Sequence, residues 1–379
     1  MIKLADKIKC TGCTACAQIC ASGAISMMED KEGFLFPVID EKLCISCKKC
    51  IGTCPVLNKP QKNVPAEVFA ARAKDEDTVS RSSSGGLFSA FANKVLEYGG
   101  VVFGAGYDEK QKVIHKSATS EEETKGLTGS KYVQSDIKDT YKSVKACLKE
   151  GKKVLFAGTP CQCAGLEGFL SKDYSNLLIV DFACHGVPSP GLFRKYLEYM
   201  STKGEIKSVR FRDKTTDRKS GHYISVEYKD GTVYREASVK DPYMLAFLQN
   251  ISLRQSCYSC EFKDFSSGSD ITIGDFWGID KTDSFLCDKE GVSLVILNTD
   301  KGRTFFEGIE DSILFDKRTA KEALRENKSI VTSTAKNPLR NKFLRDMNRV
   351  DINRLSKKYC SNSAAAKIRR LIAKCRKDR

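Results

Sequence analysis

The sequence lacks the long apolar runs that membrane-spanning helices require. No stretch of its 379 residues approaches the roughly 18 consecutive apolar residues needed to cross a bilayer. Met1 to Lys7 do not resemble the apolar core of a signal peptide and lead directly into a run of cysteines. We therefore expect a soluble, cytoplasmic protein.

Two binding signatures are also missing. Gly104 and Gly106 do not begin a dinucleotide-binding fingerprint, because position 109 is glutamate where that motif has glycine. The formal net charge is +15, yet basic residues are not interleaved with aromatic residues as in many nucleic-acid-binding surfaces. We therefore expect no nucleic acid among the partners.

Cysteine, by contrast, is abundant, with 17 residues. The first eight form two runs with C-x2-C-x2-C-x3-C spacing, which is typical of bacterial two-cluster ferredoxins. There, three cysteines of one run and the fourth cysteine of the other bind each [4Fe-4S] cluster. The predicted ligands are Cys10, Cys13, Cys16 and Cys54 for one cluster, and Cys44, Cys47, Cys50 and Cys20 for the other.

Zinc and a disulfide framework are the alternatives for these eight cysteines. Paired runs of four equally spaced thiols fit iron–sulfur clusters better than zinc knuckles. Such clusters also favour a reducing compartment. One departure from the ferredoxin pattern is Ala21 after Cys20, where proline is usual, whereas Cys54 is followed by Pro55.

Composition changes along the chain predict three parts. Residues 1–58 form the dicluster ferredoxin domain, and the polar segment 58–65 with its two prolines is a linker. Residues 66–315 form a mixed α/β domain, in which short apolar runs alternate with helices and imply a largely parallel sheet. Within it, residues 206–238 alternate polar and apolar positions and predict a hairpin-rich antiparallel insertion. Residues 316–379 are a basic helical C-terminal region.

A third group of cysteines lies in the main domain. Cys161 and Cys184 each follow a predicted strand, and Cys257 and Cys260 form a C-x2-C knuckle. Because the carboxyl ends of parallel strands meet in one crevice, we expect these cysteines to converge there. They predict a third [4Fe-4S] site or a structural zinc site. The isolated cysteines are read as ordinary thiols: Cys147, Cys287, Cys360 and Cys375.

Two glycine-containing segments precede predicted helices. The first, residues 82–86, opens an amphipathic helix predicted over 87–98. Its hydroxyls and N–H groups suit a phosphate, although a simple helix cap explains them equally well. The second segment combines a glycine turn, a hydroxyl, a cation and an aromatic ring: Gly129, Ser130, Lys131 and Tyr132.

The order of these motifs carries a resemblance. From the serine–glycine segment through Thr159-Pro160-Cys161-Gln162, Phe182-Ala183-Cys184-His185 and the cysteine knuckle to Gly274-Asp275-Phe276-Trp277-Gly278, residues 66–310 resemble the coenzyme F420 hydrogenase/dehydrogenase beta-subunit family. Several members carry a ferredoxin module in front. The resemblance implies a non-Rossmann flavin site beside a [4Fe-4S] cluster.

The resemblance also implies roles for individual residues. The third cluster would be held by Cys161, Cys184, Cys257 and Cys260, with Cys163 outside the ligand set. FAD would contact Ser84, Gly85, Gly86, Gly129, Ser130, Lys131 and Tyr132. The insertion at 206–238 departs from the family pattern and favours a substrate other than F420.

Together these features predict an iron–sulfur flavoprotein oxidoreductase. Electrons would pass between a ferredoxin-like carrier and an unidentified organic substrate at FAD. One alternative is an F420-dependent dehydrogenase or hydrogenase beta subunit, and another is a non-catalytic electron-transfer adaptor. His185 is the candidate proton donor, because imidazole titrates near neutral pH; otherwise it hydrogen-bonds a cluster sulfur or caps the next helix.

The positive charge favours an acidic electron-carrier protein as partner, although an ordinary solvated surface also accounts for it. Residues 354–379 hold ten basic residues against one acidic residue and show one apolar face. This pattern predicts either a peripheral membrane contact or a terminal helix that packs on its own domain.

Overall fold

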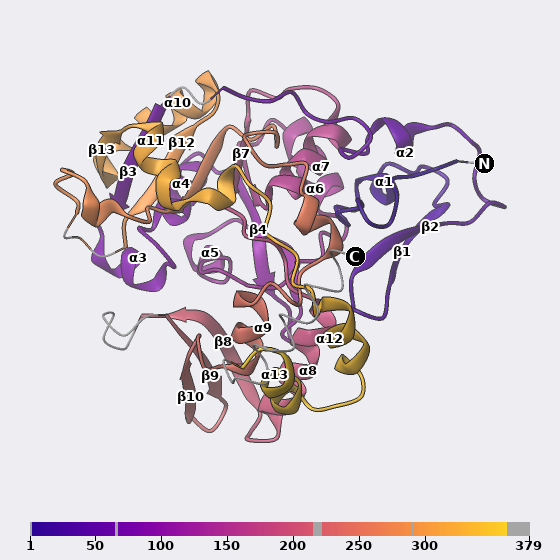
Figure 1. Cartoon of the computed structure of the whole chain (residues 1–379). Coiled ribbons are helices and arrows are strands. Elements are labelled where there is room, and N and C mark those ends of the chain that lie inside the picture. Colours follow the sequence, from indigo (N-terminus) through magenta and orange to yellow (C-terminus); the bar gives the residue numbers. More distant parts are fainter. Residues whose placement is uncertain (1, 65–66, 215–221, 288, 290, 362–379) are drawn as a thin grey trace.

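A mixed eight-stranded sheet forms the centre of the computed structural model, which describes residues 2–64, 67–214, 222–287, 289 and 291–361 (Figure 1). Its strand order is β13-β3-β12-β11-β7-β6-β4-β5. The strands are β3 (Glu67–Ala73), β4 (Val101–Tyr107), β5 (Val113–Ala118), β6 (Val154–Gly158), β7 (Leu177–Phe182), β11 (Ile271–Asp275), β12 (Ser293–Leu297) and β13 (Ile313–Arg318).

Parallel pairing is confined to the middle of this sheet. Strands β4, β6, β7 and β11 are parallel, whereas β5, β12, β3 and β13 are added by antiparallel pairs. The expectation of a largely parallel sheet is therefore wrong for the strands that flank the parallel middle on either side. The physical reason is the connections: β4 turns directly into β5 without the crossover helix that parallel strands require.

The edge strand β13 was not predicted from the sequence, because its charged second half resembles a solvated helix. It pairs with β3 across residues 313–318 and so extends over the boundary predicted at residue 316. The division into three parts stays a prediction.

Helices cover both faces of the sheet because successive strand residues point to opposite sides. On one face, α4 (Leu87–Glu97) and α10 (Asp300–Glu307) pack on a shared apolar core. On the other face lie α6 (Thr140–Lys149) and α7 (Pro160–Leu170). Helix α7 begins with a capping box between Thr159 and Gln162.

The N-terminal region lies against the α6 and α7 face (Figure 1). It contains α1 (Ala15–Gln18), the antiparallel hairpin β1 (Ile25–Glu29) and β2 (Leu35–Ile39), and α2 (Lys49–Gly52). The hairpin lies between the two cysteine runs.

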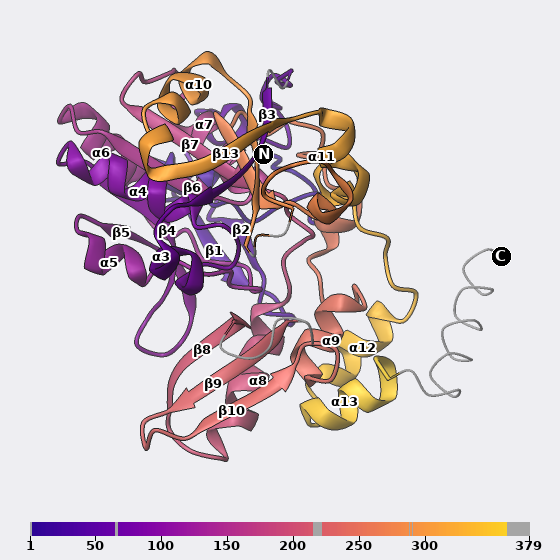
Figure 2. The ribbon, with the colours of Figure 1, turned by 90° about the vertical axis from the view of Figure 1, so that its left-hand side faces the viewer.

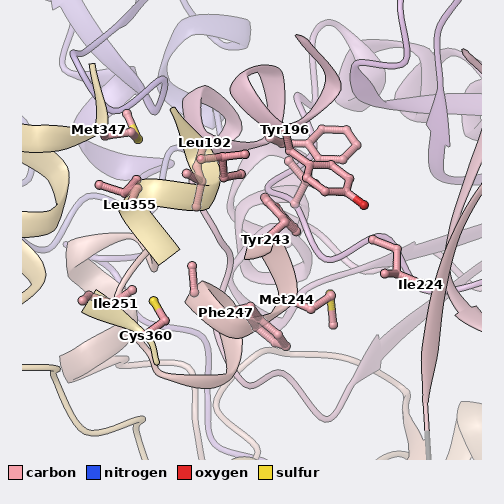
Figure 3. Packing of buried hydrophobic residues seen from close by; sticks show 14 of the residues in the cluster. Leu192, Tyr196, Ile224, Tyr243, Met244, Phe247, Ile251, Met347, Leu355 and Cys360 are labelled. Atoms are coloured by element: carbon pink, nitrogen blue, oxygen red, sulfur yellow. The ribbon is translucent and has the colours of Figure 1, made fainter. Parts of the chain in front are cut away.

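The insertion forms a second layer that Figure 2 shows below the large sheet. Strands β8 (Ile206–Asp213), β9 (Tyr223–Tyr228) and β10 (Val233–Ala237) pair antiparallel, as predicted; residues 215–221 lie outside the description. They share a core with α8 (Pro190–Ser201), α9 (Pro242–Leu248), α12 (Arg340–Met347) and α13 (Ile352–Tyr359). Figure 3 shows its centre, where the rings of Tyr196, Tyr243 and Phe247 gather.

Shorter helices complete the described chain: α3 (Glu76–Arg81), α5 (Glu121–Lys125) and α11 (Ala320–Glu326). In the described residues, none of the helices is long and apolar enough to span a membrane. Most of the predicted amphipathic tail, including Cys375, falls on residues 362–379, outside the described residues, and its membrane contact stays a prediction.

Candidate iron–sulfur centres

The first predicted ligand set gathers around one cavity. The sulfur-bearing residues Cys10, Cys13, Cys16 and Cys54 line it together with apolar side chains that include Leu4, Met27, Pro37 and Val56. Burial, and then the neighbouring Cys10 and Cys54 sulfurs, raise the pKa of the Cys13 thiol to about 12. We call this group the inner site.

The donor set of the inner site fits a cubane cluster. Buried thiolates need a cationic group to offset their charge, and an iron–sulfur core supplies it. Among the described residues, no three His, Cys, Asp or Glu side chains form a group suited to a metal ion. Four thiols suit a [4Fe-4S] cluster or a zinc ion, and the dicluster spacing of the sequence favours the cluster.

The second ligand set, the outer site, lies nearer to solvent. Burial raises the pKa of Cys50, and the neighbouring Cys20 and Cys47 sulfurs act in the same direction. Cys44 is half-buried at the start of the same loop, and Cys47 is exposed. The structure thus groups Cys20, Cys47 and Cys50 at one end of the N-terminal region.

The third ligand set forms where strands of the parallel part of the sheet end. Cys161 lies in the first turn of α7 after β6, and Cys184 follows β7. Cys257 lies in a short 3-10 helix (Gln255–Ser259), and Cys260 directly follows it. Burial strongly raises the pKa of Cys161, and the Cys260, Cys184 and Cys257 sulfurs raise it further. All four side chains therefore converge, and we call this group the sheet-edge site.

The sheet-edge site has the local features of a cluster pocket. The backbone N–H of Val187 donates to Cys257 Sγ over 3.4 Å, and Lys263 donates to the Cys184 carbonyl. Cys163 points elsewhere, since its sulfur donates to the carbonyls of Gly158 and Val180.

Helix α7 joins the inner site to the sheet-edge site. Cys161 stands in its first turn, and one turn later a Cβ on Gly165 would lie 2.9 Å from Cys13 Cβ. A Cβ on Gly168 would lie 2.5 Å from the carbonyl oxygen of Thr53. Because one helical turn rises about 5.4 Å, both cysteine groups contact neighbouring turns of one helix.

Buried polar side chains strengthen this contact. Gln18 Oε1 accepts hydrogen bonds from the N–H groups of Tyr141 and Lys142 at the start of α6, over 3.0 and 3.2 Å. Gln134 Nε2 donates to the Thr11 carbonyl over 2.8 Å. The first cysteine loop is therefore held by the main domain at several points.

The residues predicted to contact FAD lie in two segments that meet, because Ser130 N donates to Ser83 Oγ over 2.6 Å. Their polar groups are largely engaged by the protein. Ser84 Oγ donates to the Val292 carbonyl, and Gly85 N donates to Ser293 Oγ.

Lys131 and the remaining residues of these segments are similarly occupied. The half-buried Lys131 donates to the Leu127 and Thr128 carbonyls, which follow α5, and desolvation lowers its pKa to about 7. Gly86 caps α4 with φ +85°, and the Tyr132 ring packs against Phe247. The FAD contacts predicted for these two segments stay a prediction.

His185, the predicted proton donor, is half-buried beside Cys184. Its Nε2 donates to Asn250 Oδ1 over 2.6 Å. Burial lowers the pKa of the imidazole. The next helix, α8, is capped by the Ser189 side chain and not by His185. His185 instead hydrogen-bonds the side-chain amide of Asn250. Its role as a proton donor stays a prediction.

Sequence reasoning missed a polar cluster between the two sheets. Arg212 on β8 forms a partly buried ion pair with Asp275 at the end of β11, and its Nη2 lies 3.5 Å from His222 Nε2. The guanidinium also faces the ring of Trp277, which is 47% exposed. No spacing signal could have found this cluster, because Arg212 and Asp275 are 63 residues apart on different sheets.

Comparisons with protein families divide the chain in a similar way. Residues 68–141 match the N-terminal part of the coenzyme F420 hydrogenase/dehydrogenase beta subunit, and residues 151–323 match its C terminus. Residues 9–58 match the 4Fe-4S dicluster domain.

Two individual proteins are similar to parts of the chain. An uncharacterized ferredoxin of Methanocaldococcus jannaschii is 30% identical over 74 residues, which are 20% of this chain and 88% of that protein. A chain in the structure of the F420-reducing [NiFe] hydrogenase complex from Methanosarcina barkeri is 18% identical. The alignment covers 79% of this chain and 92% of that chain, with a TM-score of 0.46.

Proposed function

Because the chain belongs to the coenzyme F420 hydrogenase/dehydrogenase beta-subunit family, we propose that it is the electron-transferring beta subunit of an F420-type hydrogenase or dehydrogenase. This was the alternative to the flavin-centred reading of the sequence, and the family matches favour it. The observation that carries the proposal is helix α7, which contacts the inner site and contributes Cys161 to the sheet-edge site.

In this proposal the twelve cysteines hold three [4Fe-4S] clusters. The ligands are Cys10, Cys13, Cys16 and Cys54 at the inner site, Cys20, Cys44, Cys47 and Cys50 at the outer site, and Cys161, Cys184, Cys257 and Cys260 at the sheet-edge site. When bound, such clusters accept and release one electron at a time. The protein positions them and excludes water from the two deeper sites.

The arrangement gives the relay an order. The sheet-edge and inner sites share α7, and the inner and outer sites exchange their fourth cysteines, Cys54 and Cys20. The outer site is the one whose loop faces solvent. We therefore place contact with an external carrier at the outer site and contact with an F420-type substrate near the sheet-edge site.

An acidic electron-carrier protein fits the outer loop. Residues 42–49 are exposed except for the half-buried Cys44, and they carry Lys42, Lys48 and Lys49 with no acidic residue. Leu43 and Ile45 are 52% and 70% exposed beside them. Exposed apolar side chains ringed by one sign of charge favour a transient protein contact that is steered electrostatically.

Reduced F420 gives up a hydride, which is two electrons at once, whereas each cluster takes one electron, so a two-electron acceptor such as a flavin would have to stand between them. The predicted FAD contacts are left out of this proposal, because Ser84 and Lys131 are engaged by carbonyl oxygens. Flavin analysis of the purified protein tests this directly. One equivalent of tightly bound flavin would supply this acceptor, whereas flavin-free protein that still oxidises reduced F420 would exclude it.

The central test uses anaerobically purified protein and reduced F420. We expect about twelve irons per chain, four for each cluster, and oxidation of reduced F420 with bleaching of the cluster absorbance. About eight irons would remove the sheet-edge cluster. If dithionite reduces the clusters but F420 is not oxidised, the protein is an adaptor or acts on another substrate.

A further inference from the structure

Arg254 is the largest side chain among those that are fully buried, with 1% of its surface exposed. It lies between the N-terminal region and the main domain. The described residues hold two other buried arginines, and each has a carboxylate: Arg72 pairs with Glu76, and Arg340 pairs with Glu32. None of the ion pairs in the described ranges includes Arg254.

The contacts of Arg254 are to neutral groups. Its Nε donates to the Cys10 carbonyl over 2.8 Å, its Nη2 to the Leu35 carbonyl over 2.9 Å, and its Nη1 to Gln134 Oε1 over 3.0 Å. The guanidinium carbon lies 4.2 Å from the centre of the Phe36 ring. These bonds engage each of the three guanidinium nitrogens but leave the positive charge without a counter-ion, which is costly in a buried position.

An anionic group at the inner site would supply that counter-ion. Arg254 Nη2 lies 3.9 Å from Cys10 Sγ. Four thiolates bring four negative charges, so a thiolate-bound cubane is an anionic group. At low local dielectric, a fixed cation at this distance interacts strongly with it.

We propose that Arg254 is the buried counter-ion of the inner-site cluster and raises its reduction potential relative to that of the outer-site cluster. The proposal rests on the proposed function, because it requires the inner site to hold a cluster. Reduction adds one electron, and so one negative charge, beside a cation that is already in place. Arg254 itself exchanges no electron, so it is a positioning residue.

The first cysteine loop is shaped to admit this guanidinium. Gly12 has φ +69°, and a Cβ there would lie 2.8 Å from Arg254 Nη1 and 2.9 Å from the Leu35 carbonyl oxygen. The equivalent position of the second loop is Ser46, which is exposed. Only the inner loop, therefore, leaves room for a buried arginine.

The sheet-edge site has a cation of its own in Lys263, whose ammonium donates to the Cys184 carbonyl. Arg254 also precedes Cys257 by three residues in the chain. We therefore expect removal of the Arg254 charge to affect the inner-site cluster most and the outer-site cluster least.

The test is a redox titration of the anaerobically purified, cluster-loaded protein, followed by electron paramagnetic resonance. In R254Q we expect unchanged iron content and a lower potential for one cluster. The expected shift is at least tenfold in the reduction equilibrium, which is 59 mV for one electron. R254K keeps the positive charge, so the potential of this cluster should lie close to its value in the unaltered protein.

Two further variants guard against a purely structural effect. Q134E places a carboxylate on Arg254 Nη1 at constant size, so it should lower the same potential even where R254Q fails to fold. R340Q removes the buried arginine that already pairs with Glu32 and should leave all three potentials unchanged. Unshifted potentials in folded R254Q or in Q134E would overturn the proposal, as would an equal shift in R254K.

The readout does not use F420. Loss of F420 oxidation in the unaltered protein would overturn the proposed function, whereas these potentials are measured with chemical reductants and report on Arg254 alone.

Discussion

The two cysteine loops of the N-terminal region have the same spacing and opposite surroundings. Residues 11–15 of the first loop are all buried, and residues 45–49 of the second are all exposed. Each loop leads into a four-residue helix, α1 or α2. Ligand spacing therefore fixes the local path of the chain, and the residues between the cysteines decide what the loop contacts.

The backbones of the loops make the similarity explicit. Gly12 and Ser46, at equivalent positions, have φ of 69° and 54°, and Thr14 and Lys48 have φ of 66° and 61°. Left-handed conformations recur because three thiolates must face one cluster from a tight turn. Where the first loop has glycine and threonine, the second has serine and lysine, and only the first fits beneath the main domain.

The largest expected effect comes from filling the contact between α7 and the inner loop. G165L would place a side chain into Cys13 and Tyr141 Oη, which a Cβ already approaches within 3 Å. We expect a loss of about four irons per chain and a cost of about 3 kcal/mol or more in the free energy of unfolding. Iron analysis and thermal unfolding measure both.

Gly52 provides the matched control, since a Cβ there would meet nothing within 4 Å. G52A in the helix of the outer loop should retain all the iron and the unfolding midpoint. Equal losses of iron and of stability in G165L and G52A would mean that the two loops respond alike to an added side chain. That result would contradict the difference between a buried first loop and an exposed second loop.

The second prediction concerns charge at the outer loop. In K48E/K49E we expect electron exchange with an acidic carrier to slow about tenfold at low ionic strength, and the difference to shrink in high salt because exposed charges are screened. F420 oxidation with an uncharged dye as acceptor should be unchanged. Stopped-flow absorbance follows both reactions.

Lys321 on α11 is an exposed lysine outside the N-terminal region and serves as the control. K321E changes the net charge by the same amount per substitution. A comparable slowing in K321E would assign the effect to total charge and remove the outer loop as the contact surface.

The third prediction concerns the contact between the N-terminal region and helix α6. Q18A removes the acceptor for two N–H groups at the start of α6. Loss of a capping acceptor costs about 1 kcal/mol, so the unfolding midpoint in denaturant should fall accordingly. An unchanged midpoint would show that the N-terminal region adds no stability to α6.

The smallest effect on the free energy of unfolding is expected at Gly12 and Ser46, the equivalent turn positions of the two loops. S46G should be neutral or stabilising by less than about 1 kcal/mol, because glycine adopts positive φ without the cost that a Cβ brings. G12S meets Arg254 and should destabilise by about 1–3 kcal/mol. Chemical denaturation of the pair measures the difference, and equal effects would contradict the asymmetry.

The centres were predictable from the sequence to the extent that local chemistry decides them. The spacing of Cys10 to Cys54 identifies the dicluster domain, and the ends of β6 and β7 explain why Cys161 and Cys184 converge. The family match supports the fold and the family, while the assignment of each ligand stays a prediction. Chain reversal at β5 and the pairing of β13 depend on long-range contacts, which no short motif encodes.

Motif reading also does not show which protein groups a side chain already contacts. Lys131 and Ser84 look like ligands in a linear sequence because the sequence does not show which carbonyls they reach. Arg254 shows the converse. It belongs to no motif, and its significance follows from a contact with Cys10 across 244 positions of the chain.

That separation also has a consequence for biosynthesis. At roughly 5–20 residues per second, the ribosome needs about 12 to 49 seconds to pass from Cys10 to Arg254. During this interval the inner loop has neither its arginine nor, at first, helix α7 to cover it. The first cysteine loop, which is buried in the finished protein, thus depends on the late part of the chain for its cover, and protection from oxygen during synthesis must come from elsewhere.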